Sequence, residues 1–218
     1  WIVALAPFGV FALILPLAAR GGAGLAGVVG FYVVAYSLLT VVCIALLYLV
    51  AAAFGRVSVR RFARAALPAQ AIAFSSSSSL ASLPALVESA EDLGLPERVT
   101  GFVLPLAVST FKAAAPVTWT CGALAVAAFY GIPLHIGALA TIAFAAVFLS
   151  FAVPGVPRGG FLMLTPLFVA IGLPPEGIGI LIAVDVIPDL FATVLNTMGD
   201  LTAAVLIGRG GSGAAEVS

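Results

Sequence analysis

Long apolar runs separated by few charges constrain this chain more than any other feature. Each of four runs is long enough to cross a bilayer as a helix, which takes about 20 residues: Trp1–Ala19, Gly24–Phe54, Val99–Phe129 and Ile178–Ile207. Only 8% of the residues are charged, against about 25% in a soluble domain. Lipid offers no hydrogen-bond partner to free backbone groups, and the runs lack the alternation of a membrane β-barrel. The sequence therefore predicts an all-α integral membrane protein.

Charge indicates the orientation and excludes one class of partner. Four arginines follow the second run, and the positive-inside rule assigns such a loop to the cytoplasm: Arg56, Arg60, Arg61 and Arg64. The net charge of the chain is zero, so nothing indicates a nucleic-acid partner. We expect a multi-pass protein of the cell (inner) membrane. The chain begins at Trp1 inside an apolar run, which predicts that it is the later portion of a longer protein.

Two further apolar stretches are broken in the middle. Five serines, Ser75–Ser79, interrupt the stretch at 62–87, and PGVPRGG, Pro154–Gly160, interrupts the stretch at 136–171. The turn GLPE at Gly94 recurs as GLPPE at Gly172, and the same shift of 78 residues moves Ser77 to Gly155, inside the second break. Because one full span separates the two hairpins, they enter from opposite sides, as in an inverted repeat. Broken segments at matching places in two halves indicate the midplane site of a transporter.

The serines have a physical role at the first break. Non-helical backbone survives at membrane depth only where it is buried in protein or faces a cavity. A tip with hydroxyls, free N–H groups and a helix N-terminus can hold an anionic group such as a carboxylate. The alternative, a hydroxyl-lined contact between helices, explains one or two serines better than five.

Five ionisable residues fall at membrane depth, where each costs roughly 2.5–3.5 kcal/mol on insertion scales: Lys112, Arg158, Asp185, Asp189 and Asp200. The three aspartates and Asn196 are spaced by four, seven and four residues, so they stack along one helix face. The lysine and the arginine are natural partners of opposite sign. Such residues indicate a functional site by default, with structural pairing as the alternative.

Five segments together resemble the glutamate/aspartate transporter family, the dicarboxylate/amino acid:cation symporters. They are LAPFGVFALI near the start, LASLP after the serine tract, FVLPLAVST, GVPRGG and DVIPDLFATVLNTMGDLTAAVL, and they follow the family's order across nearly the whole chain. The resemblance implies an atypical member of the family that forms a homotrimer. It also implies an inverted-repeat transporter core with two re-entrant helical hairpins and an elevator-type transport domain.

The resemblance implies a domain organisation as well. Residues 1–22 would be a scaffold transmembrane helix, residues 23–208 the transport domain, and residues 209–218 a flexible tail. Within the transport domain the expected order is helix 24–54, re-entrant hairpin 62–92, helix 97–130, re-entrant hairpin 135–172 and helix 175–207. The second hairpin would be the extracellular gate, and earlier helices of the family would precede Trp1.

Several residues match positions with known roles in the family. Asp189 matches the aspartate that binds the substrate's amino group, Asn196 matches the asparagine at the α-carboxylate, and Asp200 matches a sodium-ligating aspartate. The predicted substrate-binding set is Ser77, Ser78, Ser79, Val156, Arg158, Asp189, Ala192, Thr193 and Asn196. The predicted ion-coupling set is Lys112, Asn196 and Asp200, with Asn196 and Asp200 as candidate sodium ligands. We expect no catalytic residue, and no cofactor other than a coupling sodium ion or proton.

The first departure from the family concerns ion coupling. The unwound NMDGT motif of the family is replaced by FKAAA, Phe111–Ala115, which removes two side-chain ligands of sodium. Lys112 could stand in for a bound cation by pairing with Asp185, Asp189 or Asp200. It could also carry a proton, since buried lysines deprotonate readily. The sequence favours such an internal cation, fixed or titrating, over an intact sodium-coupling set.

The second departure concerns the substrate. Members that carry acidic amino acids have an arginine at the position of Ala192, and Ala115 removes a second contact to the same side-chain carboxylate. These two alanines favour a neutral amino acid. The alternative is an acidic or dicarboxylate solute held by Arg158, because a guanidinium can bind a carboxylate bidentately.

Two other classes of function are compatible with some of these residues. An enzyme would need a Ser–Lys dyad with Lys112 as the base, but five serines offer no unique nucleophile, so we expect no enzyme. A degenerate family member that binds its ligand without transport would fit the loss of the NMDGT ligands. The main prediction is a symporter for a small amino acid or related carboxylate in the lipid bilayer.

Overall fold

The chain forms helices joined by short turns. The structure is a computed structural model that describes residues 2–153 and 159–210, with side chains for residues 26–151, 153, 160–161 and 163–209. No strand occurs among these residues. Three stretches in the described part are long and apolar enough to cross a membrane: Ala26–Gly55, Val99–Tyr130 and Val186–Arg209. The all-α prediction is confirmed.

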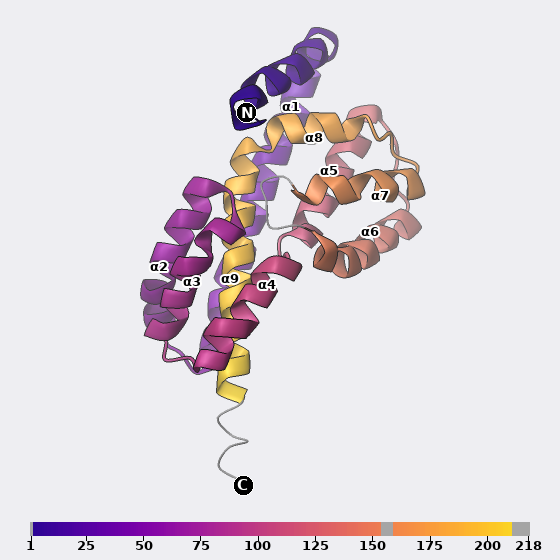
Figure 1. Ribbon diagram of the computed structural model, residues 1–218. Coiled ribbons are helices and arrows are strands. Elements are labelled where there is room, and N and C mark those ends of the chain that lie inside the picture. Colours follow the sequence, from indigo (N-terminus) through magenta and orange to yellow (C-terminus); the bar gives the residue numbers. More distant parts are fainter. Residues whose placement is uncertain (1, 154–158, 211–218) are drawn as a thin grey trace.

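Helix α1 (Ile2–Gly55) is the longest element and packs along the C-terminal helix α9 (Val186–Gly210). The sequence predicted that a first helix ends at Arg20–Gly22, but the backbone stays helical through this segment. Glycine weakens a helix by about 1 kcal/mol without necessarily ending it, and the two glycines at this junction are tolerated. Figure 1 shows that the ribbon of α1 instead changes direction sharply in its first half.

The serine tract lies at the tip of a helical hairpin made of α2 (Val59–Ser76) and α3 (Ser79–Asp92). Ser77 ends α2 in the left-handed conformation with φ 50°, and Ser78 caps the start of α3 by accepting a hydrogen bond from the Ala81 N–H at 3.3 Å. Serine is a preferred N-cap because its oxygen satisfies a free N–H of the first turn. The helical hairpin predicted at 62–92 is therefore present, with its turn at Ser77–Ser78.

The helix expected at 97–130 consists of three pieces: a π-helix at Val99–Val103, α4 (Leu104–Thr110) and α5 (Ala115–Tyr130). Phe111 has extended backbone angles, which separates α4 from α5. Pro116 lacks the N–H that a continuous helix would direct at the carbonyl of Lys112. That carbonyl accepts instead from the Ala115 N–H at 3.1 Å. The expected helix 97–130 is therefore interrupted between Thr110 and Ala115.

The second hairpin begins with α6 (Ile136–Leu149) and a 3-10 turn at Ser150–Ala152, and returns through a 3-10 turn at Gly159–Met163 and α7 (Leu164–Ala170). Residues 154–158 between the two arms lie outside the described residues, and Val156 and Arg158 are among them. The last expected helix, 175–207, is divided into α8 (Gly177–Val184) and α9 at Asp185. Pro188 explains this division, since it cannot donate to the carbonyl of Val184.

The two hairpins end in the same local structure. After α3, the N–H of Gly94 donates to the Glu91 carbonyl and that of Leu95 to the Ala90 carbonyl; after α7, Gly172 and Leu173 make the corresponding bonds to Val169 and Phe168. Both glycines have left-handed backbone, with φ 77° and 75°. This pattern is the Schellman cap. It supports the repeat inferred from GLPE and GLPPE.

Each hairpin has its own hydrophobic core. One core joins the first hairpin to α9 through Phe62, Leu86 and Met198. The other joins α5, α7 and α8 through Trp119, Phe168 and Leu181. Figure 1 shows α2 and α3 on one side of α9, with α5 to α8 on the other. The middle of α9 therefore lies where the two halves meet.

Candidate functional site

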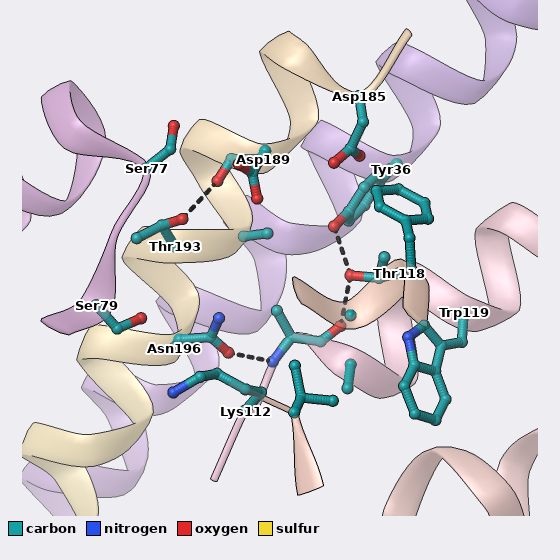
Figure 2. Close-up of a pocket in the computed structure, with 16 residues that line it drawn as sticks. Tyr36, Ser77, Ser79, Lys112, Thr118, Trp119, Asp185, Asp189, Thr193 and Asn196 are labelled. Carbon is teal, nitrogen blue, oxygen red and sulfur yellow. Dashed lines mark hydrogen bonds between the residues drawn. The ribbon is translucent and has the colours of Figure 1, made fainter. Parts of the chain in front are cut away.

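The breaks in the helices meet around one cavity of about 60 Å³. Its lining includes Ser77 and Ser79 from the first hairpin tip, Lys112 from the α4–α5 break, and Asp189 and Asn196 from α9. Figure 2 shows these side chains arranged around a common space. A single water needs about 10–15 Å³ of such space, so the cavity has room for a small solute. Broken helices that converge near mid-membrane are typical of transporter sites.

The hairpin tip presents serines to the cavity in different ways. Ser77 and Ser79 line it, whereas the Ser78 hydroxyl serves as the helix cap described above. The backbone N–H of Ser78 donates to the hydroxyl of Ser76 at 3.2 Å. The hydroxyls of Ser82 and Thr197 lie 3.3 Å apart, and this hydrogen bond connects the hairpin to α9. Two of the three predicted serines, Ser77 and Ser79, thus line the cavity.

Asn196 has a fixed orientation. Its side-chain oxygen accepts a hydrogen bond from the backbone N–H of Ala114 at 2.8 Å. Since a backbone N–H can only donate, this contact assigns the oxygen and the nitrogen of the amide. The NH₂ group therefore points away from Ala114, and Figure 2 shows it on the side of the amide toward Thr193 and Asp189. This side of the cavity has a donor suited to a carboxylate.

Close packing keeps the α4–α5 break against α9. A Cβ atom added to Gly199 would lie 2.8 Å from the Cβ of Ala113. The absence of a side chain at Gly199 lets the extended segment approach the helix. This approach brings Ala114 within hydrogen-bonding distance of Asn196 and places Lys112 beside the same helix.

Lys112 and Asp200 are buried residues whose charged forms have opposite signs. They are only 4% and 1% exposed, and the close approach of Ala113 to Gly199 brings their segments together. The Lys112 ammonium donates to the carbonyl of Val108 at 2.5 Å. Within the described residues, neither carboxylate oxygen of Asp200 has a hydrogen-bond partner. An ionised carboxylate that is buried without a positive partner costs free energy. A positive charge on Lys112 would lower this cost for Asp200.

The predicted acidic face of α9 is only partly a cavity lining. Asp185, Asp189, Thr193 and Asn196 line the cavity together with Ala192, whereas Asp200 lies deeper, beside Lys112. The Thr193 hydroxyl donates to the Asp189 carbonyl at 2.8 Å. Ala115 also lines the cavity. The two alanines singled out from the sequence thus lie at the site and offer no side-chain donor.

Among the lining residues that were not predicted from the sequence, three have polar side-chain atoms: Tyr36, Thr118 and Trp119. The hydroxyls of Tyr36 and Thr118 lie 2.5 Å apart, and Thr118 also donates to the carbonyl of Ala114 at 3.0 Å. Tyr32, one turn before Tyr36, donates to the carboxylate of Asp185 at 3.4 Å. The signal that could have revealed this contact is the four-residue spacing of Tyr32, Tyr36 and Thr40 inside an apolar helix, because polar groups at that spacing share one face.

Comparison with known proteins gives the family. Residues 1–209 match the profile of the Sodium:dicarboxylate symporter family. The chain is 32% identical over 213 residues to the Proton/sodium-glutamate symport protein of Bacillus subtilis (strain 168), covering 95% of this chain and 48% of the relative. It is 32% identical over 155 residues to Neutral amino acid transporter A of Bos taurus, covering 71% of this chain and 29% of the relative.

A third relative is Excitatory amino acid transporter 3 of Mus musculus, 34% identical over 141 residues, with 64% of this chain and 27% of the relative covered. The chain spans about half the length, or less, of these relatives. The family consists of membrane transporters, which agrees with the three candidate spans. The family predicted from the five segments is therefore confirmed: this chain belongs to the Sodium:dicarboxylate symporter family.

Proposed function

We propose that this chain forms the substrate-binding core of a secondary active transporter, a symporter for a small neutral amino acid. The observation that carries the proposal is the composition of the cavity. It combines anion-binding groups at the hairpin tip, a carboxylate at Asp189, and alanines at 115 and 192. Relatives named as symport proteins and amino acid transporters support the transport of a small solute.

The two charged groups of an amino acid have complementary partners in this cavity. Asp189 would bind the ammonium group, as a charge-assisted hydrogen bond favours. The amide NH₂ of Asn196 would donate to the α-carboxylate, together with the hydroxyls of Ser77 and Ser79. Thr193, next to Asp189 on the cavity side of α9, would complete the polar wall.

The side-chain end of the cavity favours a neutral solute. A buried carboxylate needs a positive partner or several donors, and Ala115 and Ala192 provide neither. Arg158, which could clamp an acidic solute, lies outside the described residues. An acidic or dicarboxylate substrate is therefore the competing outcome that the experiment below must distinguish.

For ion coupling, we propose that the Lys112 ammonium replaces a coupling cation beside Asp200. Sodium requires several oxygen ligands, but Phe111 and Ala113 supply no side-chain oxygen, and the side-chain oxygen of Asn196 already accepts from Ala114. Lys112 lies next to Ala113, which packs against Gly199 beside Asp200. This arrangement supports coupling to protons, or to sodium at another place, over sodium held by Asp200 and Asn196.

The family and the broken helices support an architecture for the whole protein. Residues 23–208 would be an elevator-type transport domain with re-entrant hairpins at 62–92 and 135–172, and residues 1–22 a scaffold helix. The protein would be a homotrimer in the cell membrane, and the second hairpin would act as the gate. The breaks between helices at Ser77–Ser78, at residues 111–114 and at Asp185 can exist at membrane depth because they border the cavity.

Uptake by the full-length protein in liposomes tests this proposal. We expect uptake of small neutral amino acids, with little uptake of aspartate, when sodium and proton gradients are imposed separately. Asp189→Asn should abolish uptake, and Asp92→Asn, an exposed carboxylate on α3, is the matched control. Sodium-driven aspartate uptake that exceeds neutral uptake would contradict both the substrate and the coupling. Binding without uptake under any gradient would identify a non-transporting homologue.

A further inference from the structure

The Trp119 indole is a polar group that no described residue satisfies. Trp119 lies on α5 with 0% of its surface exposed, and its Nε1–H has no hydrogen-bond partner among the described residues. A buried donor of this kind is rare in folded proteins, because it loses its bond to water and gains nothing in return. The residue also lines the cavity. Figure 2 shows the indole nitrogen on the side of the ring that faces the other labelled lining residues.

The space beside this nitrogen is kept open by a glycine. A Cβ atom added to Gly160 would lie 3.5 Å from Nε1, at the distance of an ordinary van der Waals contact. With glycine at this position, an atom from a solute can come closer and accept a hydrogen bond at about 2.9 Å. Val153 and Phe161 line the same cavity and carry no acceptor in their side chains. The acceptor that Trp119 lacks therefore has room to come from the cavity.

We propose that Trp119 selects the substrate's side chain by donating its Nε1–H to a neutral acceptor atom on it. This proposal rests on the function proposed above, in which Asp189 and the hairpin tip bind the ammonium and the α-carboxylate. Tryptophan can only donate, so the partner must be a hydrogen-bond acceptor, such as a hydroxyl or amide oxygen. A single neutral donor does not compensate a buried carboxylate. The substrate class is thus a small neutral amino acid with a side-chain hydroxyl or amide, with threonine and serine as the members that match the small volume.

An isosteric pair of substrates tests the contact directly. Threonine and valine have nearly the same shape, but only threonine has a side-chain oxygen. We expect the full-length protein in liposomes to take up threonine about tenfold or more faster than valine at low concentration, because valine leaves the indole donor unpaired. In Trp119→Phe, which removes the N–H, the ratio of threonine to valine uptake should fall about tenfold.

Gly160→Ala provides a second variant that leaves the indole in place. Its methyl group would occupy the space next to Nε1, so threonine should again lose its advantage over valine. Gly101→Ala is the matched control, because a Cβ atom there meets no atom within 4 Å. The control should keep the threonine-to-valine ratio of the wild type.

The outcomes separate this proposal from the one on which it rests. A wild-type protein that takes up no neutral amino acid overturns the proposed function and this inference with it. Uptake with a threonine-to-valine ratio that neither Trp119→Phe nor Gly160→Ala changes overturns the role of Trp119 alone. If Trp119→Phe fails to fold, benzothienylalanine at position 119 keeps the ring shape and replaces the N–H by sulfur. An unchanged ratio in that variant also overturns the role.

Discussion

Replacing Lys112 by methionine should strongly destabilise the protein. The Asp200 carboxylate is 1% exposed, and neither of its oxygens accepts a hydrogen bond from a described residue. Lys112→Met keeps most of the side-chain volume but removes the neighbouring positive charge. Breaking a buried charge pair by removing one partner costs about 3–5 kcal/mol. For a domain of this size, each kcal/mol lowers the melting temperature by roughly 2–4 °C, so the expected decrease is about 6–20 °C.

The assay is thermal unfolding of the purified protein in detergent, in sodium-free buffer. Asp200→Asn in the Lys112→Met background should recover most of the lost stability, because the double variant has no buried charge at this place. Arg60→Met removes an exposed charge on α2 and should change the melting temperature by less than about 2 °C. The reasoning is refuted if Lys112→Met melts within about 2 °C of the wild type, or if the double variant is no more stable than Lys112→Met.

A cation should partly replace the missing ammonium in the same variant. Sodium chloride should raise the melting temperature of Lys112→Met more than choline chloride does. The melting temperature of the wild type should respond equally to both salts. Equal responses in the variant would contradict the binding of a cation at Asp200. Asn196→Asp keeps the acceptor for the Ala114 N–H but replaces the NH₂ donor by an anion, so uptake should be lost with little change in stability. Substrate uptake by Asn196→Asp at the wild-type rate would rule out the proposed carboxylate contact. Gly199→Ala forces its new Cβ against Ala113 and should cost about 1–3 kcal/mol, measured as a lower melting temperature than that of Gly101→Ala. Ser77→Cys, with the native cysteines replaced, should react with a water-soluble thiol reagent and be protected by substrate; a reaction rate that substrate does not change would place the hairpin tip away from the site.

The sequence predicted those residues of the candidate site that are unusual for a membrane helix. Five serines in an apolar stretch cannot be explained as an ordinary membrane helix, and they form the hairpin tip. The aspartates and Asn196 were placed on one face because their spacing fits a helix, and α9 brings most of them to the cavity. These predictions depended on neighbours along the chain, which one sequence reveals directly.

Other parts of the site could not be predicted because they depend on distant contacts. FKAAA contains three alanines, the best helix formers, so its composition gives no sign that the backbone is extended at Phe111. The pairing of Tyr36 with Thr118 joins residues 82 positions apart. An aromatic residue such as Trp119 in an apolar run is indistinguishable from one that faces lipid. The Gly199 contact with Ala113 likewise requires knowledge of how α9 and the α4–α5 break pack.

The matching Schellman caps after α3 and α7 have a consequence for how the two halves can diverge. Each cap is made of backbone hydrogen bonds around one left-handed glycine, Gly94 or Gly172. It directs the chain into the next helix whatever side chains the preceding hairpin carries. Hairpin side chains can therefore change to suit a different ligand while the backbone keeps the same path. The glycine at each of these two caps is the residue that cannot change.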